Sequence, residues 1–169
     1  QLAVYPPNLS LSPSPRKILI LLDYNPGNSS GLTSDLVVTS LKETLERSLS
    51  AADSISVIAA FADIVPGSDG WVAATQENID GIFNRLAGRL FLNVNFSQEL
   101  LLAAQSFLQR NGTGELLWIT NRSDFPTYTD ESREYAYEIL ALLPENTMMH
   151  VLDLENVYPM SHYGSDIGY

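Results

Sequence analysis

Cysteine is absent from the chain. Disulfide bonds, thiolate metal sites and a cysteine nucleophile are therefore excluded. Long apolar runs are missing as well, because nowhere do about 18 apolar residues follow one another as a membrane-spanning helix would require. The first residues also lack the charged and then apolar build of a signal peptide. We therefore expect no transmembrane segment.

Basic residues are scarce: 9 Lys and Arg stand against 20 Asp and Glu, which gives a formal charge of -11. A surface of this sign repels phosphate backbones and anionic membranes, so nucleic acid is excluded as an expected partner. The 45% hydrophobic content is enough for a core, and 169 residues suit one domain. The composition therefore predicts one acidic domain.

Enzyme signatures are lacking too. The chain contains no Gly-x-Gly-x-x-Gly, Gly-x-x-x-x-Gly-Lys, Gly-x-Ser-x-Gly or His-Glu-x-x-His sequence. His150 lies in an apolar run typical of a core or strand-edge histidine, and His162 lies in a polar tail, so neither suggests a Ser-His-Asp triad. We predict no catalytic residue. The alternative is a Mg-dependent phosphotransfer-type hydrolase or receiver-like domain using Asp23, for which only Arg122 offers a balancing cation.

The two ends of the chain differ in composition from the middle. Residues 1–16 are rich in Pro and Ser and predict an extended lead-in, such as follows a removed export signal, so an extracellular or cell-envelope location is favoured. Residues 17–154 are expected to form the domain. Sequences of the form Asn-x-Ser/Thr would mark surface loops in a glycosylated protein, although they also arise by chance; they begin at Asn8, Asn28, Asn95, Asn111 and Asn121.

Hydrophobic periodicity switches repeatedly between strand and helix patterns. Residues 17–22 form a continuous apolar run, as a strand covered on both faces would. The next two strands are close enough to form a hairpin across a turn at 65–70. Strands are predicted at 17–22, 54–61, 70–74, 115–120 and 147–154, and helices at 32–49, 75–88, 96–112 and 130–144. Thr33 or Ser34 and Ser97 are the expected helix caps, and Gly88 and Gly112 the expected stops.

This alternation predicts an α/β fold, a doubly wound and mostly parallel central sheet with helices on both faces. Ligands of such sheets bind beyond the carboxyl ends of the strands. Asp23 ends the first strand, and Thr120 and Asn121 end the fourth. The segment 92–97 precedes a helix and brings Asn93, Asn95 and Ser97 toward the same edge. We expect three oxygen-rich loops to converge there.

These features resemble the von Willebrand factor type A family over residues 17–154: an apolar strand ending in Asp, a long amphipathic helix, a hairpin, and then alternating helices and strands. The resemblance implies a Rossmann-like fold. It also implies a metal-ion-dependent adhesion site, with Asp-x-Ser-x-Ser after the first strand, a Thr in a middle loop and an Asp after the fourth strand. Such oxygen ligands suit Mg²⁺, which then binds an acidic side chain of a partner protein.

The chain departs from that motif at most positions. Asp23 matches the leading Asp, whereas neutral residues replace the others. Asn25 and Gly27 stand at the two serines, Asn93 or Asn95 at the threonine and Asn121 at the second aspartate. Neutral oxygens bind a hard dication less strongly than carboxylates do. The resemblance therefore implies a degenerate site with weakly bound Mg²⁺ or no cofactor, unless Ser29, Ser30 or Asp124 supplies a missing ligand.

Ordinary structural roles also explain these residues. Asp23 could cap the following helix or hold its loop, and Asn25 and Asn121 are common turn residues. The expected ligand-binding residues are Asp23, Asn25, Asn28, Ser29, Asn95 and Asn121, and the expected metal ligands are Asp23, Asn25 and Asn121.

The favoured function is a non-catalytic protein-binding or adhesion module of an exported, multidomain protein, whose partner is another protein contacted through an acidic side chain. A purely structural scaffold domain is the remaining alternative. Family members continue into a further helix, whereas residues 155–169 show no helical pattern. This tail either packs in place of that helix or leads to a further domain.

Overall fold

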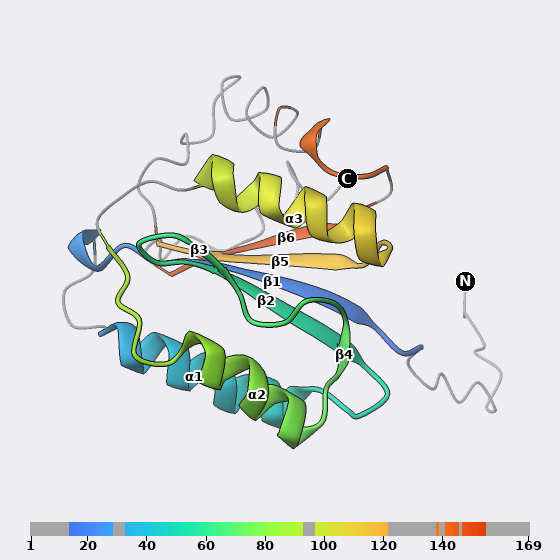
Figure 1. Cartoon of the computed structure of the whole chain (residues 1–169), viewed down its shortest axis with the longest axis horizontal. Helices are drawn as coiled ribbons and strands as arrows, with labels where there is room; N and C mark the ends of the chain where they lie inside the picture. The colour runs from blue at the N-terminus through green and yellow to red at the C-terminus, as the bar shows by residue number, and fades with distance from the viewer. Residues whose placement is uncertain are drawn as a thin grey trace, which may run out of the picture.

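The strand β1 (Lys17–Asp23) lies in the middle of a six-stranded sheet (Figure 1). Its apolar run explains this place, because Leu19, Ile20, Leu21 and Leu22 are all fully buried. The computed structural model describes residues 14–28, 33–92, 97–121, 138, 141–145 and 147–154. Residues 1–13 of the lead-in and the whole tail after Leu154 lie outside these residues.

The sheet is mostly parallel. Its order is β3 (Ile64–Pro66), β2 (Ser54–Ala60), β1, β5 (Glu115–Thr120) and β6 (Met149–Asp153), and β4 (Val72–Ala73) is also paired to β2. β1 runs parallel to β2 (Ser54–Ala60) and to β5 (Glu115–Thr120), and β5 runs parallel to β6 (Met149–Asp153). The helices α1 (Ser34–Ser48) and α2 (Gln76–Leu86) cover one face, and α3 (Ser97–Asn111) covers the other (Figure 1). The predicted fold class is confirmed.

The antiparallel part of the sheet differs in detail from the prediction. Both β3 (Ile64–Pro66) and β4 (Val72–Ala73) pair antiparallel with β2. β3 pairs with the second half of β2, and β4 pairs with the first two residues of β2. The pairing of 70–74 with 54–61 is therefore confirmed. The interpretation of 65–70 as a turn was wrong at Val65 and Pro66, which belong to β3. Proline fits there because β3 is an edge strand.

The helices begin and end close to their predicted bounds. They are α1 (Ser34–Ser48), α2 (Gln76–Leu86) and α3 (Ser97–Asn111). Thr33 caps α1 by accepting a hydrogen bond at 3.2 Å from the Leu36 backbone N–H, and Thr75 caps α2 in the same way. Most of the predicted helix 130–144 lies outside the described residues; Glu138, Ala141 and Leu142 are helical.

The period-two alternation of β1 divides the core into two layers. Leu19 and Leu21 pack toward α3, in the layer that contains Trp118. Ile20 and Leu22 pack toward α1 and α2. Within the described ranges, no helix is both long and apolar enough to cross a membrane.

Candidate functional site at the carboxyl ends of β1 and β5

Asp23 and Thr120 lie side by side at the carboxyl ends of β1 and β5, where they are register partners. Both side chains are fully buried. A polar pair at this depth requires hydrogen-bonding neighbours, because burial without them costs free energy. Ser97 of α3 is one such neighbour of Asp23, and the loops that follow the two strands are joined to each other by Asn121.

Asn121 joins these two loops through its side-chain amide. Its Oδ1 accepts a hydrogen bond from the Asn25 backbone N–H at 2.6 Å, and its Nδ2 donates to the Asn25 backbone carbonyl at 2.7 Å. Both bonds are buried and link residues 96 positions apart in the chain. We call this pair of bonds the Asn25–Asn121 clamp. It fixes the start of the β1–α1 loop against the end of β5.

The Asn25 side chain has a local partner. Its Oδ1 accepts a hydrogen bond from the Gly27 backbone N–H at 2.8 Å, which is an Asx turn, and the turn leads into the short 3-10 helix η1 (Pro26–Asn28). Pro26 and Gly27 are exposed. Beside the buried clamp, the chain therefore presents a backbone surface of fixed shape to solvent.

Ser97 brings the third loop to the same place. Its hydroxyl donates a hydrogen bond to Asp23 Oδ2 at 2.9 Å, across 74 positions of the chain. Ser97 was expected near this edge as the cap of its helix; it is the first residue of α3. Its contact with the carboxylate was not predicted. The available signal was the position of this hydroxyl just after the oxygen-rich segment 92–96.

The structure thus brings together three of the predicted ligand residues, Asp23, Asn25 and Asn121. We call this edge of the sheet, formed by these three residues with Thr120 and Ser97, the rim. Asn28 ends η1, one residue beyond Gly27, and its backbone alone is described. Ser29 and Asn95 lie outside the described residues, as do Asn93, Ser30 and Asp124.

The side-chain oxygens of Asp23, Asn25 and Asn121 suit hydrogen bonds between the loops better than coordination of a metal ion. Mg²⁺ demands near-octahedral oxygen ligands, typically with one or two carboxylates. Among the described residues at the carboxyl ends of β1 and β5, Asp23 has the one carboxylate, and both amide oxygens already accept backbone N–H groups. No group of three or more His, Cys, Asp or Glu side chains that could hold a metal ion occurs in the described part of the chain. The metal-ligand role of Asp23, Asn25 and Asn121 stays a prediction.

Comparison with known proteins gives no match by sequence: no protein-family model matches, and no curated protein does. Solved structures do match in fold. A von Willebrand factor type A protein from Catenulispora acidiphila aligns with a TM-score of 0.53 at 11% identity, over 82% of this chain and 33% of that one. The pilus adhesin SpaC from Lactobacillus rhamnosus GG aligns with a TM-score of 0.56 at 11% identity, over 91% of this chain and 27% of that one. SpaC in its open conformation gives a TM-score of 0.55.

This chain therefore spans between a quarter and a third of the length of the proteins it matches. Identities this low carry information about the fold alone. The chain has the fold of a von Willebrand factor type A domain.

Proposed function

We propose that residues 17–154 form a non-catalytic protein-binding or adhesion module of an exported, multidomain protein, and that its rim binds metal weakly or not at all. The observation that carries the metal part is the Asn25–Asn121 clamp. By the resemblance, Asn121 stands where relatives keep an aspartate, and its amide is committed to the backbone of Asn25. The adhesion part is supported by the similarity in fold to the pilus adhesin SpaC.

The clamp suits binding without a cation. The clamp fixes Asn25, and the Asx turn of Asn25 holds the exposed Gly27, so a partner that meets this turn orders little additional chain. Recognition of an acidic side chain at Asp23 would instead require a cation between the two carboxylates. Dependence of partner binding on Mg²⁺ therefore separates these two modes of contact.

A calorimetric titration tests the metal part. Mg²⁺ and Mn²⁺ are added to the wild type, to Asp23→Asn and to the control Asp35→Asn, which alters an exposed carboxylate in the first turn of α1. We expect no saturable binding tighter than about 1 mM in any of the three proteins, because one carboxylate among neutral oxygens holds a hard dication weakly. Tighter binding that Asp23→Asn abolishes and Asp35→Asn leaves intact would contradict the proposal.

Retention on immobilised proteins tests the adhesion part. Beads coated with the chain are passed over an array of purified extracellular proteins in Mg²⁺ and in EDTA. We expect retention on at least one protein in both buffers, and a loss of about tenfold in Asn28→Arg, since a long cation there disrupts the contact surface. The control Thr113→Arg places the same charge at the opposite edge, just before β5, and is expected to be retained normally. Equal retention of both variants, or retention on no protein, would favour a scaffold instead.

A further inference from the structure

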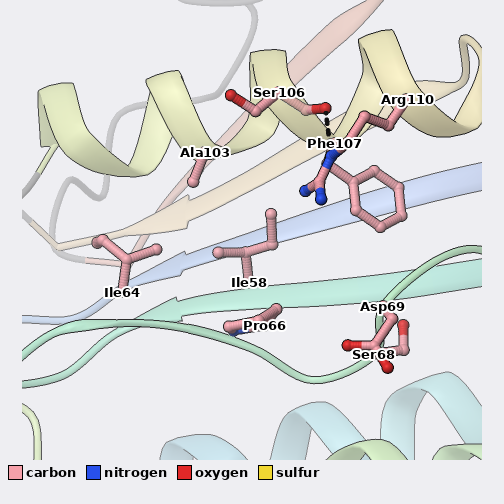
Figure 2. A pocket seen from close by; sticks show the side chains of 9 residues that line it. All are labelled: Ile58, Ile64, Pro66, Ser68, Asp69, Ala103, Ser106, Phe107 and Arg110. Atoms are coloured by element: carbon pink, nitrogen blue, oxygen red, sulfur yellow. Dashed lines mark hydrogen bonds between the residues drawn. The ribbon is translucent and has the colours of Figure 1, made fainter.

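A second surface lies between α3 and the edge of the sheet formed by β2 and β3. It is a pocket of about 370 Å³, and none of its lining residues belongs to the rim (Figure 2). Ile58 and Phe107 are almost fully buried and form its inner wall. Ile64, Pro66 and Ala103 complete the apolar lining. The volume falls in the range of roughly 300–1,000 Å³ that is usual for ligand pockets.

Arg110 gives this apolar pocket a positive charge. Its Nε donates a hydrogen bond to the Ser106 backbone carbonyl at 3.1 Å, and the rest of the guanidinium points from α3 toward the strands (Figure 2). The other arginines of the described residues each lie within 4.0 Å of a carboxylate: Arg16, Arg47, Arg85 and Arg89. Among those residues, Arg110 is the one arginine with no such carboxylate.

The one acidic residue among those that line the pocket pairs with an arginine other than Arg110. Asp69 lines the pocket, and its highly exposed carboxylate lies 3.5 Å from Arg85 Nη1. Arg110 therefore keeps its charge available beside the apolar lining, although the chain as a whole carries a charge of -11. The net negative charge of the chain repels an acidic ligand, but salt screens this repulsion beyond about 8 Å under physiological conditions.

From this geometry we propose that the pocket binds a segment of a partner protein that carries an aromatic or aliphatic side chain next to a carboxylate. The apolar side chain packs against the lining over Ile58 and Phe107, and the carboxylate accepts hydrogen bonds from the terminal guanidinium nitrogens of Arg110. Guanidinium suits this role because it is weakly hydrated and its forked donors match both carboxylate oxygens. The contact needs no metal and is independent of the rim.

Two blocked peptides of equal size test the proposal: acetyl-Gly-Phe-Asp-Gly-amide and its Asn counterpart, which lacks the negative charge. Binding is followed by NMR through the methyl signals of Ile58, Ile64 and Ala103. We expect the Asp peptide to shift these signals and to bind at least fivefold more tightly than the Asn peptide, with no change in EDTA. Equal affinity of the two peptides for the wild type, or shifts confined to other methyl groups, would overturn the proposal.

Variants assign the charge preference. In Arg110→Gln the ratio of the two affinities is expected to fall to about one, because the guanidinium that pairs with the carboxylate is gone. In the control Arg47→Gln, on the exposed side of α1, the ratio is expected to stay unchanged. An unchanged ratio in Arg110→Gln, with thermal unfolding showing a folded protein, would refute the role of Arg110. Because Asp23→Asn is expected to leave peptide binding intact, failure here is distinct from failure of the rim proposal.

Discussion

Asn121 makes the most specific contact of the rim, since one side chain satisfies both backbone groups of Asn25. An amide carries a donor and an acceptor in a fixed plane, which a carboxylate or an alkyl group cannot reproduce. Both residues are buried, so a lost bond here leaves a polar group without water to replace its partner.

Replacement of Asn121 by Asp is therefore expected to destabilise the protein by about 2–4 kcal/mol at neutral pH. The introduced oxygen would face the Asn25 carbonyl where the amide nitrogen now donates. Protonation returns a donor, so the difference from wild type should shrink as the pH approaches 4 or so. Urea unfolding at a series of pH values measures this difference. Asn121→Ala serves as control, and its deficit should not vary with pH; an Asp variant as insensitive as the Ala variant would contradict the clamp.

Asp53 is the second residue whose hydrogen bonds carry a consequence for stability. The backbone N–H groups of Ser50 and Arg16, at 2.9 and 3.0 Å, and then the Arg16 guanidinium, hold the pKa of Asp53 well below its ordinary value. These contacts fasten the segment before β1 to the loop before β2. They favour the ionised carboxylate in the folded state only.

A folded-state pKa below the unfolded value of about 3.9 means that this stabilisation is complete above that pH and is lost as the pH falls toward the folded value. We expect Asp53→Asn to be less stable than wild type by about 1–3 kcal/mol at neutral pH. The difference should diminish between about pH 5 and pH 2. Urea unfolding across this range checks it, with the exposed Asp63→Asn as control. A gap that stays constant down to pH 2 or so would argue against ionised Asp53 as its source.

At the scale of elements, the glycines show how local sequence ends a helix. Gly88 follows α2 with φ +73, a conformation that L side chains rarely adopt, so it permits the chain to turn away. Gly81 lies inside α2, where an added Cβ would have no heavy atom within 4 Å. One helix thus offers a matched pair of glycines with opposite requirements.

Gly81→Ala is expected to stabilise the protein by about 0.5–1 kcal/mol, because alanine loses less backbone entropy in a helix. Gly88→Ala is expected to destabilise it by about 1 kcal/mol, because its Cβ strains the left-handed conformation. Thermal or urea unfolding of both variants gives the signs. Two shifts of the same sign would mean that α2 ends differently from the structure described above.

Elements with a strong period were predictable, and weakly patterned ones were not. The apolar run of β1 and the capped, amphipathic α1 and α2 follow from residues adjacent in the chain. β3 was missed because its Pro66 precedes Gly67, a pair typical of turns. Tertiary packing decides that position: a Cβ on Gly67 would lie 2.7 Å from Ile82 Cγ2 of α2, so glycine allows close approach there as well.

At the scale of the whole molecule, the charge of -11 opposes compaction. Most ion pairs of the described residues have both side chains at least a third exposed, and such pairs contribute about 0–1 kcal/mol each. We therefore expect the repulsion among the excess carboxylates to outweigh the attraction within the ion pairs.

Stability is accordingly expected to rise as NaCl increases from about 0.02 to about 0.5 M, since salt screens this repulsion. The urea midpoint at neutral pH measures the change, and KCl serves as a control for effects specific to sodium. A midpoint that falls with both salts would show instead that the ion pairs, such as the contact of Lys42 with Asp80, dominate.

The sequence by itself determined the α/β class, the central place of β1 and the collection of Asp23, Asn25 and Asn121 at one edge, because hydrophobic period and strand direction are local properties of the chain. Only the tertiary structure decided which groups touch. The contact of Ser97 with Asp23 and the clamp of Asn121 on Asn25 join residues 74 and 96 positions apart, and the pocket beneath Arg110 is formed by strands and a helix from separate parts of the chain. Such pairings depend on the order of the strands in the sheet and on the packing of α3 against it. Residues that are adjacent in the sequence do not determine either of these.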